Sequence, residues 1–233
     1  MNLDFIKKND LCLSCGACKH IAPKKISIKQ DLKKGMFHPE ISSPLSKEES
    51  KKILEICPAN GYPIKQIAED IFPSAINEDY RTGKYIKIGA YKMNDLSLLK
   101  NASSGGIMTG LAKKMLELGI VDGIVASSFK YVKDEISVST EIITDYKNLP
   151  KTQGSKYMPV PALLVIEKIK RFDGKVVFIG TPCQIATIRR LQETDSELKQ
   201  KIKYTIGNFC GGFKDLRELQ KFKKISGMKG KQI

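Results

Sequence analysis

The feature that most constrains this chain is a run of three cysteines in "CLSCGACKHIAP". Cys12, Cys15 and Cys18 are spaced three residues apart, and a fourth cysteine, Cys57, stands directly before Pro58. In ferredoxins with two clusters, three cysteines at this spacing share a cubane with a distant Cys-Pro. The spacing therefore predicts one [4Fe–4S] cluster, held by Cys12, Cys15, Cys18 and Cys57.

The same spacing predicts that a second cluster is missing. Counting back from Cys57, the other three-cysteine run would fall at Lys47, Ser50 and Ile53, and its distant ligand at Ala22. All four ligands of one cluster are present, whereas all four ligands of the other are replaced. We expect a ferredoxin-like segment over residues 1–78 that keeps a single cluster.

Other uses of these cysteines stay open. Four thiolates also suit zinc, although zinc ribbons favour two C-x2-C pairs. A disulfide framework fits poorly, because the chain has no secretory signal. His20 could be a ligand, but its position between Cys18 and Pro23 favours solvent exposure. Gly16 suits a tight turn at the cluster, and the ring of Pro58 would shield one side of it.

The large net charge of the chain says little about its function. The formal net charge is +15, which suits an anionic partner. However, the lysines are scattered and often stand beside acids, so a solvated surface is the simpler interpretation. A zinc-stabilised nucleic-acid-binding protein is a weaker alternative, and we expect no nucleic-acid partner. With no long apolar run or signal peptide, we expect a cytoplasmic protein without a membrane span.

The rest of the chain, residues 79–233, alternates predicted strands and helices. This order favours an α/β fold with a mainly parallel sheet flanked by helices. A helix over 103–119 would be capped by Ser103 or Ser104 and stopped by Gly119. Further helices are predicted over 162–172 and 181–191. Strands are predicted at 85–91, 120–129, 135–143 and 174–180, and in the segment 202–212, which ends in a glycine-rich turn.

Turns rich in serine, glycine and threonine lie near the predicted strand ends. The turn "SSGG" (103–106) precedes a helix, where free N–H groups and the helix dipole favour an anion. A capped helix without a ligand explains four such residues equally well. Cys183, in "GTPC", suits a buried thiol, a redox-active residue or a neighbour of a cofactor. A small core residue is the simplest interpretation of Cys210.

Taken together, these motifs resemble the coenzyme F420 hydrogenase/dehydrogenase beta-subunit family. The resemblance rests on the cysteine run, "KKGMFHPEI", "NASSGGIMTG", "TQGSKYMPVP", "GKVVFIGTPCQIATIRRL" and "NFCGG", which stand in order along the chain. Members of this family continue beyond the point that corresponds to "SGMKGKQI". The resemblance therefore also implies an α/β domain that is shortened or incomplete at its C-terminus.

The resemblance implies an iron–sulfur flavoprotein that binds FAD and uses coenzyme F420 or a ferredoxin-like protein as redox carrier. Other subunits of an oxidoreductase complex are further expected partners. Cys183 and Lys156 are the implied catalytic residues, with Lys156 suited to a phosphate or to reduced flavin. The implied flavin-binding residues are Ser103, Ser104, Gly105, Gly106, Gly154, Ser155, Lys156, Tyr157, Thr181 and Pro182. The alternative is a non-enzymatic electron-transfer subunit with a cluster but no flavin.

Overall fold

The computed structural model describes the chain except residues 1, 75–76, 133–134, 219–220, 222–224 and 226–233. The "SGMKGKQI" segment, on which the expectation of a shortened C-terminus depends, therefore lies outside the described residues. In the described ranges no helix is both long enough and apolar enough to span a membrane.

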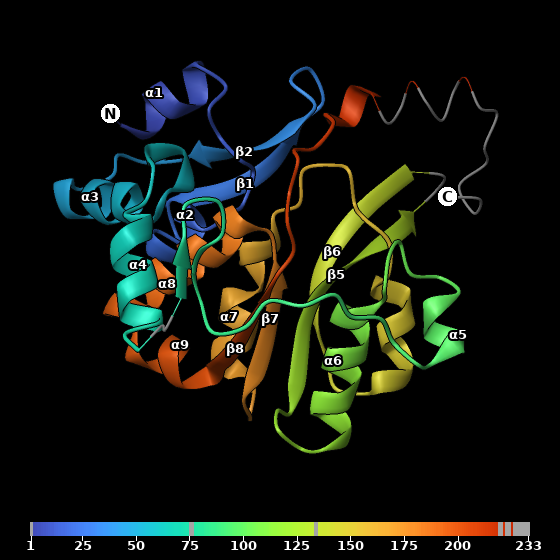
Figure 1. The fold of residues 1–233 in the computed structure, drawn as a ribbon. Coiled ribbons are helices and arrows are strands. Elements are labelled where there is room, and N and C mark those ends of the chain that lie inside the picture. The colour runs from blue at the N-terminus through green and yellow to red at the C-terminus, as the bar shows by residue number, and fades with distance from the viewer. Residues whose placement is uncertain (1, 75–76, 133–134, 219–220, 222–224, 226–233) are drawn as a thin grey trace.

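A four-stranded sheet forms the centre of the molecule (Figure 1). Its strands are β5 (Gly123–Val132), β6 (Glu135–Ile143), β7 (Val176–Gly180) and β8 (Ile202–Gly207), in the order β6-β5-β7-β8. β7 pairs with β5 and with β8 in parallel, and β6 pairs with β5 antiparallel. The prediction of a mainly parallel sheet in an α/β fold is confirmed.

Helices and short 3-10 turns cover the two faces of this sheet because successive side chains of β7 point to opposite sides. Val176 and Phe178 join one core, and Val177 joins the other. The first core packs against η3 (Ala162–Val165), α7 (Ile166–Arg171), α8 (Pro182–Thr194) and α9 (Ser196–Lys201), and the second against α6 (Ile107–Glu117) and η2 (Tyr146–Thr152).

The N-terminal segment forms a small unit beside this sheet. Its elements are α1 (Leu3–Lys8), α2 (Cys18–Ile21), β1 (Ile26–Asp31), β2 (Met36–Ile41), α3 (Lys47–Ile56) and η1 (Pro58–Asn60). β1 and β2 form an antiparallel hairpin. α3 begins with a capping box in which Ser46 and Glu49 bond each other's backbone N–H groups, which fixes where this helix starts.

The N-terminal unit shares its core with the sheet. Ala17 and Ile56 belong to the same buried cluster as Phe178, and the N–H of Leu163 donates to the carbonyl of Cys15 at 2.9 Å. The segment after β8 returns to the hairpin turn, where the Leu216 N–H bonds the Gly35 carbonyl at 2.8 Å. The cysteine loop is therefore fixed against the α/β part of the chain.

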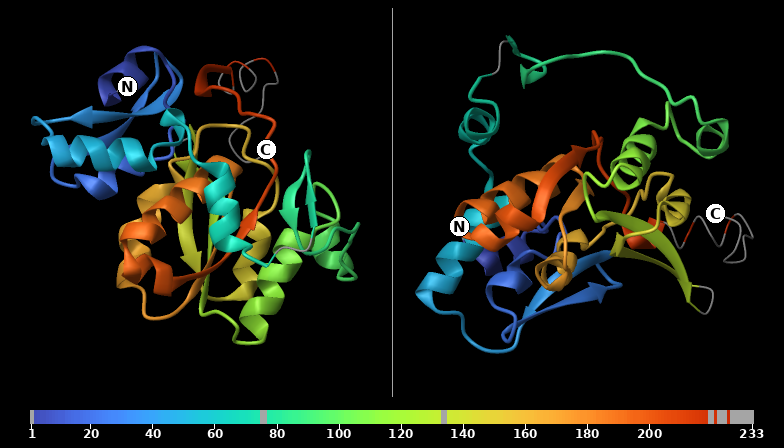
Figure 2. Two further views of the ribbon diagram at one scale, coloured as in Figure 1. Left: turned by 60° about the vertical axis from the view of Figure 1, so that its left-hand side comes forward. Right: turned by 90° about the horizontal axis from the view of Figure 1, so that it is seen from below.

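The connection between the two parts contains α4 (Ile64–Ile71), β3 (Asn77–Asp79), β4 (Gly83–Tyr85) and α5 (Leu96–Leu99). In Figure 2 it arcs away from the body of the molecule. The predicted strand over 85–91 is wrong beyond Tyr85, since Ile86 and Ile88 are exposed. Alternating apolar residues favour a strand, but a strand also needs a neighbour to pair with, and this stretch has none in the described structure.

Two helix starts also differ from prediction. α6 begins at Ile107, and its N-cap is Gly106 in the left-handed conformation (φ +71°), so neither Ser103 nor Ser104 caps it. The Gly105 carbonyl instead accepts a hydrogen bond from the N–H of Met93 at 2.9 Å, which turns the chain before the helix. The segment 162–172 starts as the 3-10 turn η3 and becomes α-helical only at Ile166. Gly119 follows the end of α6 with φ +63°, as predicted.

Candidate functional site

The cysteine loop is shaped by two residues with positive φ. Ser14 has φ +57° and Gly16 φ +84°, and such angles place successive peptide N–H groups on the inside of a turn. Ser14 is buried, and its hydroxyl accepts the Phe37 N–H at 3.1 Å, which holds the loop against β2. A Cβ on Gly16 would lie 3.1 Å from Cγ of Leu164. The positive φ therefore favours glycine there, and Leu164 leaves little room for a Cβ.

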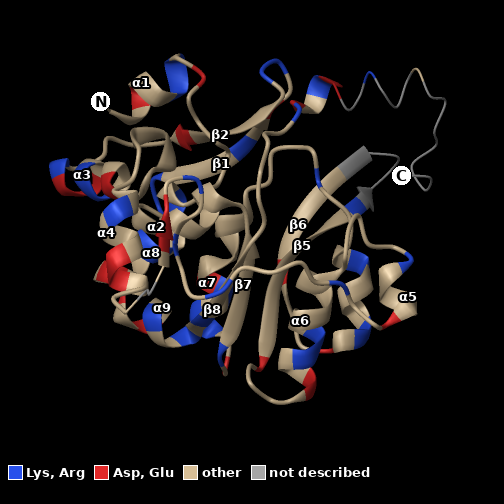
Figure 3. Ribbon diagram, in the orientation of Figure 1, with Lys and Arg blue, Asp and Glu red and all other residues tan. Residues whose placement is uncertain are grey.

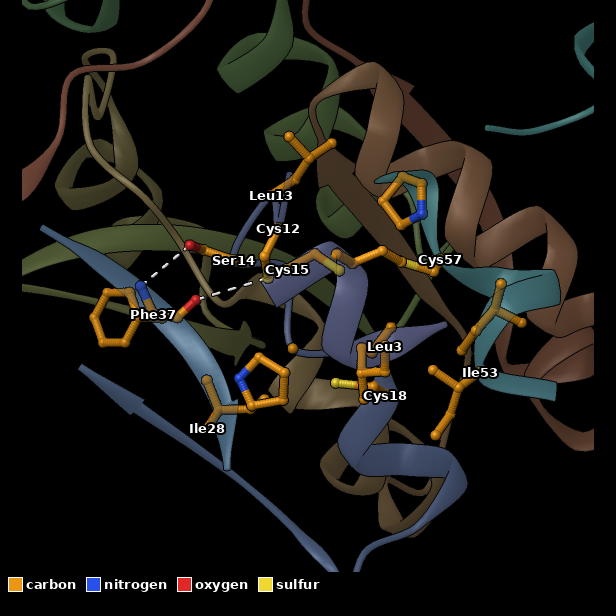
Figure 4. Close-up of a pocket in the computed structure, with 16 residues that line it drawn as sticks. Leu3, Cys12, Leu13, Ser14, Cys15, Cys18, Ile28, Phe37, Ile53 and Cys57 are labelled. Atoms are coloured by element: carbon orange, nitrogen blue, oxygen red, sulfur yellow. Dashed lines mark hydrogen bonds between the residues drawn. The ribbon is translucent and has the colours of Figure 1, made fainter. Parts of the chain in front are cut away.

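The four cysteines line one cavity (Figure 4). Cys57 reaches it from the end of α3, opposite the loop that carries the other three. The remaining lining residues are almost all apolar: Leu3, Ile6, Leu13, Ser14, Gly16, Ala17, Ile28, Phe37, Pro39, Ile53, Ile56 and Pro58. Pro58 is buried, as expected for a ring that shields this site.

Burial is the main reason why the pKa of each of these thiols is raised, to about 12 for Cys18. The thiols also raise one another's pKa by charge repulsion: Cys12 and Cys57 act on Cys15 and on Cys18, and Cys57 acts on Cys12. This mutual effect agrees with the position of all four thiols on one cavity. Four thiolates in an apolar cavity need positive charge to offset them, which bound iron or another metal would supply.

Backbone N–H groups already point at the sulfurs. Those of Ser14, Ala17 and Lys19 act on Cys12, Cys15 and Cys18 respectively, each lowering the thiol pKa against the effect of burial. The N–H groups of Ala59 and Asn60 act in the same way on Cys57. Such donors favour the charged form of a sulfur ligand. The sequence could not reveal these donors, because almost every residue has a backbone N–H and only the fold decides its direction.

The cysteines surround the cavity and do not meet at one point. Among the residues that the structure describes, no group of three His, Cys, Asp or Glu side chains is placed to hold a single metal ion. A site for one ion needs ligands that converge on that ion. The thiols of a cubane bind four different irons, so they need a wider arrangement around a common centre.

The four positions that correspond to ligands of a second cluster have different surroundings. Ala22 and Ile53 are buried and pack with Leu3 and Ile26. Lys47, by contrast, is exposed on α3. Two of the four positions therefore belong to a hydrophobic core, and the number of clusters stays a prediction.

His20 does not lie free in solvent, so that expectation is wrong. Its side chain is 13% exposed, and Nδ1 lies 2.7 Å from Oε1 of Glu167 on α7. Nε2 faces Asp195, which caps α9, at 3.6 Å. Because both ring nitrogens face carboxylates of the α/β part, His20 acts as a contact between the two parts of the chain.

The "SSGG" turn lies at the start of α6. Ser103 and Ser104 are exposed, and no side chain caps the helix, so its first N–H groups are available. A Cβ on Gly105 would lie 2.5 Å from the carbonyl oxygen of Tyr91. The close approach of the chain near Tyr91 is thus one reason for this glycine, independent of any ligand.

The "GSKY" turn follows η2. The Lys156 ammonium donates to the carbonyls of Thr152, Gln153 and Gly154, and it lies over the ring of Phe129 at 5.6 Å from its centroid. Burial lowers the pKa of Lys156 to about 8. Ser155 and Tyr157 are exposed, Tyr157 at 67%.

Thr181, Pro182 and Cys183 begin α8 at the carboxyl end of β7. The Thr181 N–H donates to Oε1 of Gln184 at 3.0 Å, and the Thr181 hydroxyl lies 3.3 Å from Sγ of Cys183. Helix capping therefore accounts for part of the "TPCQ" motif. Cys210 is exposed in the loop after β8, so its interpretation as a core residue is wrong. Its Sγ instead accepts the Gly212 N–H at 3.4 Å.

Hydrogen bonds link these turns along the carboxyl end of the sheet. Gln153 donates to the Leu98 carbonyl at 2.8 Å, beside the "SSGG" turn. The Lys214 N–H bonds the Tyr157 carbonyl at 3.1 Å, and the Asn208 N–H bonds the Gly180 carbonyl at 2.9 Å. These bonds tie the "GSKY" turn to the segments around Leu98 and Lys214, and the segment after β8 to the end of β7.

Comparisons with known proteins place this architecture. Residues 90–167 match the family model described as coenzyme F420 hydrogenase/dehydrogenase, beta subunit N-term, and residues 173–233 match the companion model for the C terminus of the same beta subunit. A coenzyme F420 hydrogenase subunit beta from Methanosarcina barkeri is 29% identical over 142 residues, which are 57% of this chain and 47% of that protein.

A second match covers more of the chain. A coenzyme F420-dependent sulfite reductase from Methanocaldococcus jannaschii is 25% identical over 230 residues, which are 89% of this chain and 32% of that protein. A chain of the F420-reducing [NiFe] hydrogenase complex from Methanosarcina barkeri superposes with a TM-score of 0.55 and 25% identity, over 64% of this chain and 52% of that one. The chain thus spans about half, or less, of these relatives.

Proposed function

The chain belongs to the coenzyme F420 hydrogenase/dehydrogenase beta-subunit family, and we propose that it is an electron-transfer oxidoreductase of that type. Cys12, Cys15, Cys18 and Cys57 would hold one [4Fe–4S] cluster, which would supply single-electron transfer to FAD, with coenzyme F420 or another soluble carrier as redox partner. The observation that carries the proposal is the set of four cysteines around one apolar cavity beside the carboxyl end of the sheet.

The cavity fits a cubane better than a zinc ion. Cys12, Cys15, Cys18 and Cys57 line one cavity, and in the described residues no three of them are placed to hold a single metal ion. The backbone N–H groups at the sulfurs and the apolar wall are both features that tune an iron–sulfur cluster. A zinc site would need no such wide spacing of the thiols.

The flavin proposal rests on the turns at the carboxyl end of the sheet, where α/β folds bind their ligands. The uncapped start of α6 and the exposed hydroxyls of Ser103 and Ser104 suit the phosphates of FAD. Gly154, Ser155, Tyr157, Thr181 and Pro182 would line the same region. When bound, a flavin can accept two electrons from a hydride donor and pass them on singly.

Two side chains of this region would act on the bound flavin directly. Lys156 can be neutral or charged near pH 8, so its ammonium could leave the carbonyls that it now bonds and face a negative charge. Cys183, at the start of α8, would border the reacting face of the flavin. Both roles follow from the family resemblance together with the positions of these residues.

The cluster and the proposed flavin region are connected by a short stretch of chain. Cys15 accepts a hydrogen bond from Leu163 at 2.9 Å, and Val160 accepts one from Gln184, next to Cys183, at 3.4 Å. Leu163 and Val160 both follow the "GSKY" turn closely in sequence. This proximity suits single-electron transfer between the two centres. The names of the relatives further support a role as one subunit of a larger oxidoreductase.

The first test is anaerobic purification, followed by measurement of iron, sulfide, zinc and released flavin per chain. About four irons and one FAD are expected, together with reduction of the bound flavin by reduced F420. About four irons without flavin would favour the alternative, an electron-transfer subunit that binds no flavin. Zinc in place of iron would refute both functions.

Cysteine variants sharpen this test. Cys57→Ser should lose most of its iron, because it removes one of the four ligands. Cys210→Ser is the matched control, because Cys210 is exposed in a loop away from the cavity lining. An equal iron content in the two variants would contradict the ligand assignment.

A further inference from the structure

β2 carries a histidine for which the proposed function has no use. His38 is 3% exposed, and neither ring nitrogen has a hydrogen-bond partner in the described part of the chain. Buried polar groups nearly always find a partner, and exceptions call for an explanation. His38 also lies in "KKGMFHPEI", a motif that neither the cluster ligands nor the flavin turns account for.

The neighbours of His38 form part of the cluster cavity. Phe37 and Pro39 line it, and the Phe37 carbonyl oxygen lies 3.9 Å from Sγ of Cys12. Because side chains alternate along a strand, His38 points to the opposite face of β2, one residue from the cavity wall. A change of charge in the cavity therefore acts on His38 through protein and not through water, where it would be weakened.

The other charges around His38 are largely balanced. Lys34 and Asp31 face it from the hairpin, and Asp10 and Lys7 face it from the end of α1. Lys34 and Asp10 pair at 2.5 Å, and the Asp31 carboxylate accepts two backbone N–H groups of the hairpin turn.

Two further pairs lie around the hairpin and are also balanced. Opposite His38 on β1, Lys29 pairs with Glu40 at 2.6 Å. Over the hairpin turn, Asp215 pairs with Arg217 at 2.8 Å. A change in the charge of the cluster is therefore not offset by the other charged groups around His38.

We propose that His38 takes up a proton from solvent when the cluster accepts an electron. This rests on the proposed function, with a one-electron carrier as the source of the electron. The electron makes the cluster more negative by one charge, and the neutral imidazole becomes an imidazolium with one positive charge. The region thus keeps the same net charge in both redox states.

The direction of the coupling follows from the environment of His38. Burial, and then the positive charge of Lys34, lowers the pKa of His38, so the ring is neutral at neutral pH while the cluster is oxidised. The added negative charge of the reduced cluster raises this pKa. Between the pKa of His38 with the cluster oxidised and its pKa with the cluster reduced, reduction leads to binding of a proton.

The test measures the midpoint potential of the cluster in the whole protein. EPR monitors the cluster in redox titrations carried out at several values from about pH 5 to pH 9. In the wild type the potential should fall as pH rises, by up to about 59 mV for each tenfold fall in proton concentration. In His38→Gln, and in His38→Phe as a second variant, the potential should not depend on pH. His20→Gln is the matched control and should keep the slope, since the chain has only two histidines.

A pH-independent potential in the wild type, or an unchanged slope in both His38 variants, would overturn the inference. Ring ¹⁵N signals give a second readout: the proton affinity of His38 should be at least tenfold higher in the reduced protein. A protein that assembles no iron at all refutes the proposed function and this coupling with it. A loaded cluster whose potential ignores pH refutes the coupling alone.

Discussion

Replacing Ile53 by alanine tests whether the place of a second cluster has become hydrophobic core. Ile53 is 0% exposed on α3 and packs with Leu3, Ala22 and Ile26. The substitution removes three carbon groups, worth about 0.8 kcal/mol each in transfer free energy. The cavity left behind adds to this loss, and such replacements cost about 2–5 kcal/mol. We expect the free energy of unfolding to fall by about 3 kcal/mol.

The assay is thermal unfolding monitored by circular dichroism. The wild type and the variants are loaded with iron beforehand and heated at the same rate. For a chain of this size, 1 kcal/mol shifts Tm by about 2–4 °C, so a fall of roughly 6–12 °C is expected. Leu54→Ala is the matched control, because Leu54 is the next residue on α3 and only half-buried. It should lose about 1 kcal/mol or less.

The result that would refute this reasoning is a Tm for Ile53→Ala no lower than that of the control. Ile53 also lines the cluster cavity, so iron must be counted in each sample. If Ile53→Ala keeps about four irons per chain and still melts early, its loss comes from core packing. Early melting with lost iron would instead report on the cluster.

Two further predictions concern the cysteine loop and pH. Gly16→Ala should lower both Tm and iron content more than Gly61→Ala does. Both glycines have φ near +83°, but only at Gly16 does a Cβ meet a neighbour, Leu164 at 3.1 Å. Equal losses in the two variants would mean that only the backbone strain of about 1–2 kcal/mol matters. Burial lowers the pKa of His38 below 6.5. As pH falls through 6.5, the unfolded chain therefore takes up a proton that the folded chain does not bind, and the folded state loses stability. Tm should drop less between about pH 7.5 and pH 5.5 in His38→Gln than in the wild type, and an equal drop would contradict this prediction.

Several of the scattered lysines form pairs with glutamates on the surface. Figure 3 shows Lys residues beside Glu residues on α3, where Lys52 lies 2.7 Å from Glu48 and Lys51 3.9 Å from Glu55. Exposed pairs of this kind contribute little to stability. They explain part of the charge pattern without any nucleic-acid partner.

The errors of sequence reasoning have a common cause. Residues 85–91 have the apolar alternation of a strand, but alternation does not reveal whether another strand lies alongside. Ser103 and Ser104 are good capping residues, yet a backbone bond between Met93 and Gly105 decides where α6 begins. Local propensity is a weak prior, and contacts between distant segments override it.

The sequence by itself determined the class of fold, and it carries the prediction of a cluster at the four cysteines. Four cysteines at fixed spacing, with four replaced positions beside them, predict a single cluster because ligand number and separation are written in the chain. Alternating strands and helices likewise predict the α/β sheet, since hydrophobic periodicity is a local property. Both predictions needed no knowledge of distant contacts.

Only the tertiary structure decided how the rest of the chain surrounds those cysteines. Packing brings Cys57 across to the loop of the other three, places the N–H groups of Ser14 and Ala17 at the sulfurs, and buries His38 behind the cavity wall. These facts depend on directions and burial, which arise when segments far apart in sequence pack together. A single sequence does not record them.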